Sequence, residues 1–395
     1  MSVPNSLDFE YYMKFPISPD KIENNWRLVT QEVTSYDVLL SEGLLDFEND
    51  TLETAGIVSG EIPKRRFIVI DKVVDDLYGP KVRNYFSKRQ IFTHIICIDS
   101  NEENKTVDNV FYVIKELNGF GLSRRSEPVI GIGGGVLLDI MGLACSLFRR
   151  GVPYVRVPTT LMGLIDAGIG AKTGVNFEQH KNRIGTYFPP LATYLDRSFL
   201  RSIDDRHMAN GIAEIVKIAL IKDKELFEVM EACAERMIPD RLTGSACYDF
   251  IISRAVAGML EELEPNLWEK NLERVVDYGH TWGPTLEMLA LPDLLHGETV
   301  AIDMAYSLIL AEQRGLITNE EGARGLDLMR RVGLPLYHPK FNSDLAERGL
   351  EDAVRHRDGK QRVPLTSGLG GAVFVNDLSQ EELVLACRAL ETLAQ

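Results

Sequence analysis

The sequence predicts an α/β fold in two parts, a Rossmann-like parallel-sheet domain followed by an all-α domain. In the first half, short β-rich runs alternate with helix-like segments, which is the βαβ pattern of a parallel sheet. These runs are "RRFIVID" (65–71), "THIICID" (93–99), "EPVIGIG" (127–133) and "YVRVPTT" (154–160). In the second half, apolar residues recur every three to four positions, as in "HMANGIAEIVKIALI", so helices are expected there.

The change between the two patterns places the domain boundary. Two prolines interrupt the sequence at "FPPLATYLD", so we expect residues 1–188 to form the α/β domain and residues 189–395 the helical domain. A chain of 395 residues is long enough for two ordinary cores. The segment before "PKRRFIVID" carries no recognisable motif. We expect it to be an N-terminal extension that adds a strand or covers a dimer surface.

Charge and cysteine content narrow the functional classes. The chain has 58 acidic and 43 basic residues, a net charge of −15, which argues against nucleic acid or membrane partners but permits a local basic pocket. Five scattered cysteines indicate neither a disulfide framework nor a thiolate zinc site, and they fit a reducing cytoplasm. Because the sequence shows neither a signal-peptide pattern nor about 18 consecutive apolar residues, we do not expect secretion or membrane spanning.

A glycine-rich turn is the first candidate ligand site. "VIGIGGGVLLDIMGLA" reads as a buried strand, glycines and an apolar helix, an arrangement in which a pyrophosphate can approach the helix N-terminus. Val136 occupies the sixth position of GxGxxG, so a plain strand-to-helix turn explains these glycines as well. Upstream, Glu102 and Lys105 in "EENKT" follow a strand, where they can meet ribose and phosphate; a solvated charged loop is the alternative.

Three segments of the helical half carry candidate metal ligands: Glu214 in "GIAEIVKIAL", His280 in "YGHTWGP" and His296 in "LLHGETVA". Two imidazoles and one carboxylate suit a catalytic zinc ion and leave one position for substrate. Sequence spacing does not show that they converge, so structural histidines are an equal alternative. Lys217 lies one helical turn after Glu214, where it would bind a phosphate or hydroxyl group unless it is a surface lysine.

A basic group lies between the glycine-rich turn and these ligands. Lys172 stands in "GIGAKTGVN", and Lys181, Asn182 and Arg183 stand in "HKNRIG", among glycines in both cases. A cationic cluster in an acidic protein indicates a pocket for a phosphorylated ligand.

Together these segments resemble the dehydroquinate synthase superfamily, the sugar phosphate cyclases. The resemblance covers roughly residues 65–305 and extends loosely to "RDGKQRVPL". It rests, in order, on "EENKT", "GIGGGVLLD", "FRRGVPYVRVPTTLMGLIDAGIGAKTGVN", "KNRIGTYFPP", "NGIAEIVK", "YGHTW" and "LLHGETVAID". It implies a dehydroquinate synthase-like fold with a dinucleotide-binding domain and a helical metal- and substrate-binding domain. Bound NAD, a divalent metal such as zinc or cobalt, and a homodimer are also implied.

By position, the resemblance implies three groups of site residues. The metal ligands would be Glu214, His280 and His296. The NAD contacts would be Asp71, Glu102, Lys105, Gly134, Gly135, Asp139, Thr159, Thr160, Asp166 and Lys181. The groups acting on substrate and phosphate would be Lys172, Asn182, Lys217, Asp277, His356 and Lys360, with Arg150 reaching the phosphate site of the neighbouring subunit.

Two departures from dehydroquinate synthases bear on the substrate. Those enzymes typically have asparagine at the position of Asp277 and a second histidine at that of Pro284, and both positions face the pocket if this segment is helical. A carboxylate at Asp277 would repel a substrate carboxylate and accept hydrogen bonds from hydroxyl groups. The pattern is similar to the sedoheptulose 7-phosphate cyclases, and "MLEELEPNLWE", Asp277 and His356 resemble their 2-epi-5-epi-valiolone synthase group. The alternatives are 2-epi-valiolone synthase and desmethyl-4-deoxygadusol synthase, then 3-dehydroquinate synthase.

The resemblance also implies a reaction in which NAD is recycled. A hydride would pass from the sugar phosphate to NAD, phosphate would be eliminated, the hydride would return, and an intramolecular aldol addition would close a carbocycle. The metal would act as a Lewis acid, lysines would neutralise oxyanions, and Asp166 would lie near the nicotinamide. A metal-dependent polyol dehydrogenase, the alternative from another class, would accumulate NADH, and a noncatalytic binding relative would not require the full set of metal ligands.

Overall fold

The computed structural model describes residues 20–22, 25–27, 30, 33–57, 60, 62–178 and 180–393. The chain divides into a small unit, residues 1–35, and one compact unit, residues 36–395. Within the small unit, β1 (Asp20–Ile22) pairs antiparallel with β2 (Asn25–Arg27). Most of the first half of the predicted N-terminal extension lies outside the described residues.

The first half of the large unit is a six-stranded parallel sheet with the order β3-β10-β7-β6-β4-β5. Its strands are β3 (Asp37–Leu40), β4 (Arg65–Asp71), β5 (Phe92–Ile98), β6 (Val129–Gly133), β7 (Tyr154–Pro158) and β10 (Ala192–Leu195). The accompanying helices are α1 (Thr51–Thr54), α2 (Lys72–Lys88), α3 (Val107–Phe120) and α4 (Gly135–Leu147). The four predicted β-rich runs therefore correspond to β4, β5, β6 and β7.

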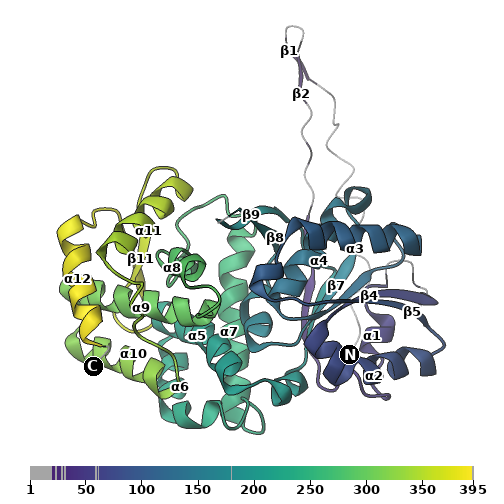
Figure 1. The fold of residues 1–395 in the computed structure, drawn as a ribbon, viewed down its shortest axis with the longest axis horizontal. Coiled ribbons are helices and arrows are strands. Elements are labelled where there is room, and N and C mark those ends of the chain that lie inside the picture. Colours follow the sequence, from purple (N-terminus) through teal and green to yellow (C-terminus); the bar gives the residue numbers. More distant parts are fainter. Residues whose placement is uncertain are drawn as a thin grey trace. The chain divides into compact units, whose positions relative to one another are not determined.

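Strand β4 shows why helices cover both faces of this sheet (Figure 1). Successive side chains of a strand point to opposite faces. Phe67 and Val69 belong to the hydrophobic core that includes residues of α3 and α4, whereas Ile68 and Ile70 belong to the core that includes residues of α1 and α2. A strand buried on both sides reads as a continuous apolar run, which is the pattern of "RRFIVID".

A hairpin extends from the sheet half toward the helices. It consists of β8 (Lys172–Phe177) and β9 (His180–Tyr187), which pair antiparallel. Asn182 on β9 has a left-handed backbone, with a φ of 52°. Just before the hairpin, a π-helical turn, η4 (Gly163–Ala167), follows β7. Both elements carry predicted site residues.

The second half is helical and packs around one large hydrophobic core (Figure 1, green to yellow). Its helices are α5 (Asp205–Ile221), α6 (Lys224–Met237), α7 (Ala246–Leu263), α8 (Gly283–Ala290), α9 (His296–Gln313), α10 (Asn319–Arg331), α11 (Ser343–His356) and α12 (Gln380–Thr392). Two short strands, β11 (Val363–Thr366) and β12 (Ala372–Val375), form an antiparallel pair within it. The predicted fold class is confirmed, and the C-terminal half contains this small sheet in addition to its helices.

The sheet extends past both ends of the predicted α/β pattern. Strand β10 begins at Ala192, so the boundary at residue 188 precedes the last strand of the sheet. Strand β3 pairs in parallel with β10 and forms an edge, which confirms that part of the N-terminal extension adds a strand. Because residues 36–395 form one compact unit, their division into two domains stays a prediction.

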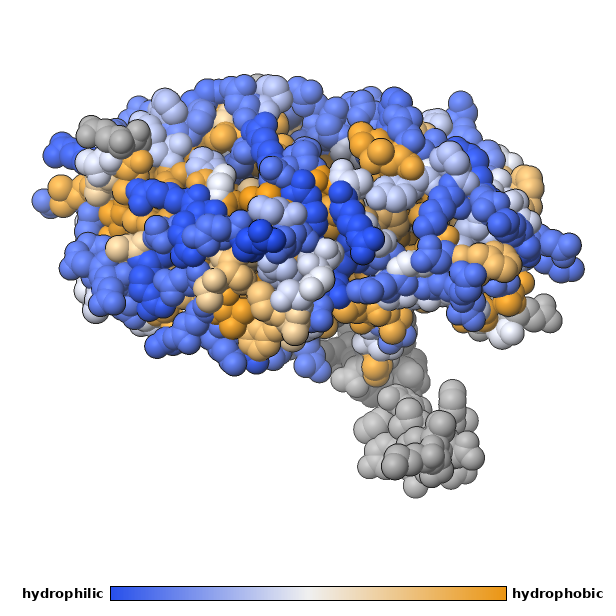
Figure 2. Space-filling model, turned by 90° about the horizontal axis from the view of Figure 1, so that it is seen from below, coloured by the Kyte–Doolittle hydropathy of each residue, from blue (hydrophilic) through white to orange (hydrophobic). Residues whose placement is uncertain are grey.

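The face seen in Figure 2 is mainly hydrophilic. On this face, hydrophilic residues separate smaller groups of hydrophobic ones. None of the helices described here has the length and apolar composition that a membrane crossing requires.

Candidate active site

The three predicted metal ligands converge. Glu214 lies on α5, His280 precedes α8, and His296 is the first residue of α9. One ligand atom from each lies within 4.8 Å of the others. Nε2 of His280 and Nε2 of His296 are 3.8 and 3.6 Å from Oε1 of Glu214. The structure therefore brings the three predicted ligands together, and their role in binding a metal stays a prediction.

The surroundings of Glu214 fit a cation. Its side chain is fully buried, and Oε1 accepts no hydrogen bond from the residues that the structure describes. Lys217, also buried, forms an ion pair with Oε2, which leaves Oε1 facing the two imidazoles. A buried carboxylate oxygen without a hydrogen-bond donor is unfavourable unless a cation binds it. Two imidazoles and one carboxylate form the donor set of a catalytic zinc site with an open position.

The segment around His280 is not a continuous helix, so the helical condition under which Asp277 and Pro284 would both face the pocket is not met. A short 3₁₀ turn, η7 (Val275–Asp277), ends before His280, and α8 begins after it. Gly279 has a φ of 75°, and a Cβ there would lie 2.8 Å from Cγ1 of Val300, so the position requires glycine. Pro284 lies in the first turn of α8, where its missing N–H has no helical partner to lose.

Both histidines are oriented through their Nδ1 atoms. Nδ1 of His280 is 3.1 Å from the carbonyl oxygen of Tyr278, and Nδ1 of His296 is 2.8 Å from Oε2 of Glu287. Burial and the like charge of Lys217 lower the pKa of His280 to about 3. Burial and Lys181 also act to lower the pKa of His296, but the carboxylates of Glu287 and Glu214 outweigh them and raise it to about 9.

A second group of charges surrounds Asp277. Arg274 forms ion pairs with both Asp277 and Glu269, and Lys172 at the start of β8 pairs with Glu269. On the other side, the buried Arg357 lies 3.9 Å from Oδ2 of Asp277. Burial opposes ionisation of Asp277, but Arg274, Arg357 and Lys172 outweigh it and lower its pKa to about 2. Asp277 is therefore a carboxylate at neutral pH, held between two arginines.

The predicted cofactor residues gather at the carboxyl ends of neighbouring parallel strands, where open α/β sheets bind ligands. Gly134 and Gly135 follow β6 and begin α4, and Thr159 and Thr160 follow β7. Gly134 gives α4 no side-chain cap, so the amides of its first turn are open to an anion. The arrangement fits the pyrophosphate of a dinucleotide.

Side chains around this turn form a polar network. Lys105 pairs with Asp139 on α4 at 2.6 Å and donates to Oδ1 of Asn182 at 2.7 Å. Oε1 of Glu102 accepts a hydrogen bond from Asn176 at 2.9 Å. The network therefore joins the "EENKT" loop to α4 and to the β8–β9 hairpin.

Two further cofactor candidates contribute carboxylates. Asp71 caps α2, accepting from the amides of Val73 and Val74, and its other oxygen accepts from Ser100. Asp166 on η4 lies near Lys217 and Glu214, and burial raises its pKa. The structure thus places Asp166 near the cluster of Glu214 and His296, and its contact with NAD stays a prediction.

Three predicted residues are less closely tied to the site. His356 lies at the end of α11 and is exposed at the surface. Its partial desolvation lowers its pKa, and the nearby charge of Asp277 acts in the opposite direction. Lys360 is exposed in the loop that follows α11. Arg150 is exposed at the end of the 3₁₀ turn η3 (Phe148–Arg150), so its predicted role in a neighbouring subunit stays a prediction.

Sequence reasoning missed four charged residues that the structure places in the site. They are Glu269, Arg274, Glu287 and Arg357. In the sequence these residues look like ordinary solvated charges in a loop or at the end of a helix. The only usable signal was position, because Glu287 follows His280 by seven positions and Arg357 adjoins His356.

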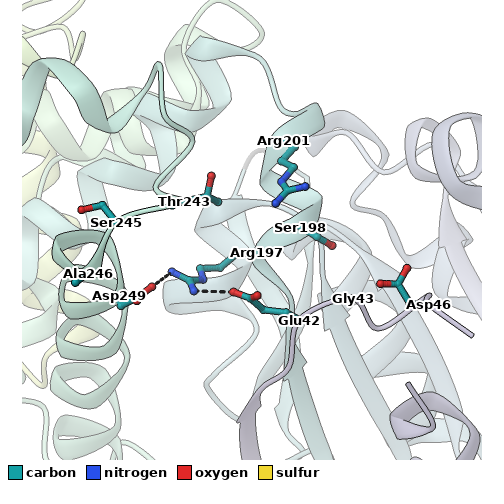
Figure 3. Close-up of a pocket in the computed structure, with 11 residues that line it drawn as sticks. Glu42, Gly43, Asp46, Arg197, Ser198, Arg201, Thr243, Ser245, Ala246 and Asp249 are labelled. Atoms are coloured by element: carbon teal, nitrogen blue, oxygen red, sulfur yellow. Dashed lines mark hydrogen bonds and ion pairs between the residues drawn. The ribbon is translucent and has the colours of Figure 1, made fainter. Parts of the chain in front are cut away.

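A separate cavity of about 620 Å³ lies between the loop after β3, the 3₁₀ helix η5 (Arg197–Ser202) and the N-terminus of α7 (Figure 3). Arg197 crosses it, pairing with Asp249 at 2.5 Å and with Glu42 at 2.8 Å. The predicted site residues do not line it. Because its central cation is already neutralised by two carboxylates, we assign this cavity no ligand.

The family of the chain follows from comparison with known proteins. The models of the 3-dehydroquinate synthase N-terminal and C-terminal parts match residues 95–210 and 211–353, respectively. The chain therefore belongs to the 3-dehydroquinate synthase family, as the motif resemblance predicts.

Within this family, the chain is most similar to one group of cyclases among the relatives considered. It is 51% identical to a 2-epi-5-epi-valiolone synthase of Actinomyces sp, over 94% of this chain and 98% of that protein. It is 38% identical to a demethyl-4-deoxygadusol synthase of Trichormus variabilis, over 92% and 89% of the two chains. The structure of ValA, a 2-epi-5-epi-valiolone synthase from Streptomyces hygroscopicus subsp. jinggangensis 5008 with NAD+ and Zn2+ bound, is 49% identical, with a TM-score of 0.89 over 93% of this chain and 99% of that one.

Proposed function

We propose that this chain is a 2-epi-5-epi-valiolone synthase, a sugar phosphate cyclase that converts sedoheptulose 7-phosphate into the cyclitol with release of phosphate. The observation that carries the proposal is Asp277, an ionised carboxylate between Arg274 and Arg357, three residues from the metal ligand His280. A carboxylate at this position disfavours a substrate that places its own carboxylate there and favours one that places hydroxyl groups there. The identity to 2-epi-5-epi-valiolone synthases supports the same assignment.

The proposed cofactors are zinc, or cobalt in its place, and NAD. Glu214, His280 and His296 would hold the metal, and the uncapped start of α4 with the network around Lys105 would hold NAD. When bound, zinc would polarise a substrate hydroxyl group, and NAD would accept and later return a hydride. ValA carries this pair of cofactors.

The protein's own share of the reaction is positioning and charge neutralisation. Lys172 and Asn182 on the hairpin, with the buried Lys217, supply donors for phosphate and hydroxyl oxygens. Asp277, fixed by Arg274, would accept hydrogen bonds from substrate hydroxyl groups. These groups would hold an extended sugar phosphate in a conformation suited to ring closure.

The assignment is tested by incubating the purified protein with sedoheptulose 7-phosphate, NAD and zinc. We expect one phosphate released per cyclitol formed, a product with the NMR spectrum of 2-epi-5-epi-valiolone, and no net NADH. A parallel incubation with the 3-dehydroquinate synthase substrate should be unproductive. Turnover of that substrate, a different cyclitol, or steady NADH formation with a polyol would each overturn the assignment in favour of a named alternative.

Replacing Asp277 by Asn should lower kcat/KM for sedoheptulose 7-phosphate by roughly 10- to 100-fold. A hydrogen bond to a charged group contributes about 1.5–3 kcal/mol to binding. A loss of about 1.4 kcal/mol in binding of the transition state lowers kcat/KM tenfold. The matched control is Asp223→Asn, which removes a carboxylate paired with Arg254 at 2.7 Å at the start of α6 and should leave the kinetics unchanged. Unchanged kinetics in Asp277→Asn would show that this carboxylate does not act on the substrate.

We further propose that the active form is a homodimer in which Arg150 serves the phosphate site of the other subunit. The exposure of Arg150 at the end of η3 supports this assignment. Mixing two inactive variants, Arg150→Ala and Glu214→Ala, tests it. Recovery of activity on mixing is expected, and its absence despite subunit exchange would count against the proposal.

A further inference from the structure

One buried carboxylate, Glu287, links the sheet half of the site to the metal cluster. Glu287 lies on α8 and is 2% exposed. Its Oε2 is 2.8 Å from Nδ1 of His296, and its Oε1 forms an ion pair with Lys181 on β9. Both oxygens are thus occupied by groups from two other elements, the hairpin and the start of α9.

The chemistry of these partners fixes where the protons lie. A carboxylate accepts hydrogen bonds and an ammonium group donates them, so in the neutral form of His296 that can bind a metal, Nδ1 must carry its proton toward Glu287. The lone pair then resides on Nε2, the atom 3.6 Å from Oε1 of Glu214. Lys181 lies 3.2 Å from Nδ1, but a protonated Nδ1 accepts nothing from it. Glu287 accepts a hydrogen bond from each of these two neighbouring donors, Nδ1–H of His296 and the ammonium group of Lys181.

We propose that Glu287 is a positioning residue that holds His296 in the tautomer and orientation needed to bind the metal. The backbone carbonyl of Tyr278 does the same for His280, whose Nδ1 lies 3.1 Å away. His296 has a carboxylate partner instead, and a carboxylate raises the basicity of the ligand it orients. Lys181 holds Glu287 in turn, so a residue predicted to contact NAD supports a metal ligand. The proposal rests on the proposed zinc site and therefore on the proposed function.

The test measures metal binding rather than turnover. Glu287→Gln keeps the shape but offers one acceptor oxygen and one NH₂ group, so it cannot accept from both His296 and Lys181. We expect its affinity for zinc, measured by competition with a chromophoric chelator, to fall 10- to 100-fold. The visible absorption of the cobalt-substituted variant should also change in shape and intensity. The metal-free variant should still fold, as its circular dichroism spectrum will show, although Lys181 loses its buried partner and the melting temperature falls.

Two control variants separate positioning from general stabilisation. Lys181→Met leaves Glu287 free to accept from His296, so its zinc affinity should equal or exceed that of the wild type. Glu127→Gln removes a buried carboxylate paired with Arg65, outside the site, and should have no effect on zinc affinity. Equal loss of zinc in Glu287→Gln and Lys181→Met would indicate a structural ion pair and overturn the proposal.

The remaining outcomes are also decisive. Unchanged zinc affinity and an unchanged cobalt spectrum in Glu287→Gln would overturn the proposal. If that variant does not fold, Glu287→Asp keeps the charge but shortens the reach, and it should show a smaller loss of zinc affinity; no loss would again overturn the proposal. A wild-type chain that binds zinc and NAD without cyclising sedoheptulose 7-phosphate would refute the proposed function alone, because the Glu287 measurements need no substrate.

Discussion

Glu214→Gln is expected to abolish stoichiometric zinc binding and to lower turnover of sedoheptulose 7-phosphate by at least about a thousandfold. The substitution keeps the volume of a fully buried side chain but removes the negative charge that faces both imidazoles. Loss of Lewis-acid stabilisation raises the activation free energy by several kcal/mol. Each increase of about 1.4 kcal/mol slows the reaction tenfold. Zinc content by elemental analysis and kcat from phosphate release measure the two effects.

The affinity for NAD should survive this substitution, because the predicted pyrophosphate site lies at the start of α4 and not at Glu214. Glu231→Gln is a suitable control, since Glu231 pairs with Arg324 at 2.7 Å on helices outside the site. Full zinc content in Glu214→Gln would refute the ligand set. Loss of NAD binding together with zinc would instead indicate that the variant is misfolded.

Trp282→Ala is expected to lower the free energy of unfolding by about 3–5 kcal/mol. Trp282 is fully buried, and its Nε1 donates to the carbonyl oxygen of Ala346 on α11 at 2.9 Å. Its ring meets that of Tyr306 on α9 edge-on, with centroids 4.7 Å apart. Removing the indole leaves a cavity among three helices and a buried carbonyl without its donor. Urea denaturation followed by circular dichroism measures the loss.

Trp268 provides the matched comparison. It is 42% exposed and packs edge-on against Tyr187, so Trp268→Ala should lower the unfolding free energy by at most about 1 kcal/mol. Similar losses in the two variants would mean that burial of the indole is not what stabilises this region. Because Trp282 lies two residues after His280, a weakened zinc affinity should accompany the larger loss.

The regular elements were predictable because their patterns are local. Strand β4 is apolar without interruption from Phe67 to Ile70, since both faces of the sheet are covered. Strand β3 gives a weaker pattern in the sequence. It has four residues, lies at the edge of the sheet beside one strand, and is mostly exposed, so its residues do not form a buried apolar run. The break around His280 escaped prediction because the positive φ of Gly279 depends on the approach of Val300 from another helix.

The site was predictable only where motifs identify residue types. Glu214 and the two histidines belong to recognisable segments, and the structure brings them together. Glu287 and Arg274 gave no comparable signal, since a charged residue in a loop or on a short helix is usually solvated. Their importance arises from partners that are distant in the sequence, such as Lys181, 106 positions from Glu287. Such pairings become visible only when the chain is folded.

The pairing of β3 with β10 has a consequence for the order of events during synthesis. Residues 37–40 leave the ribosome well before residues 192–195, which form the neighbouring strand among those described. At roughly 5–20 residues per second, the roughly 150 intervening residues take about 8 to 30 seconds to translate. During that interval the exposed Leu39 and Leu40 have no strand to join. The nascent chain thus passes through a stage at which this edge is open to chaperones.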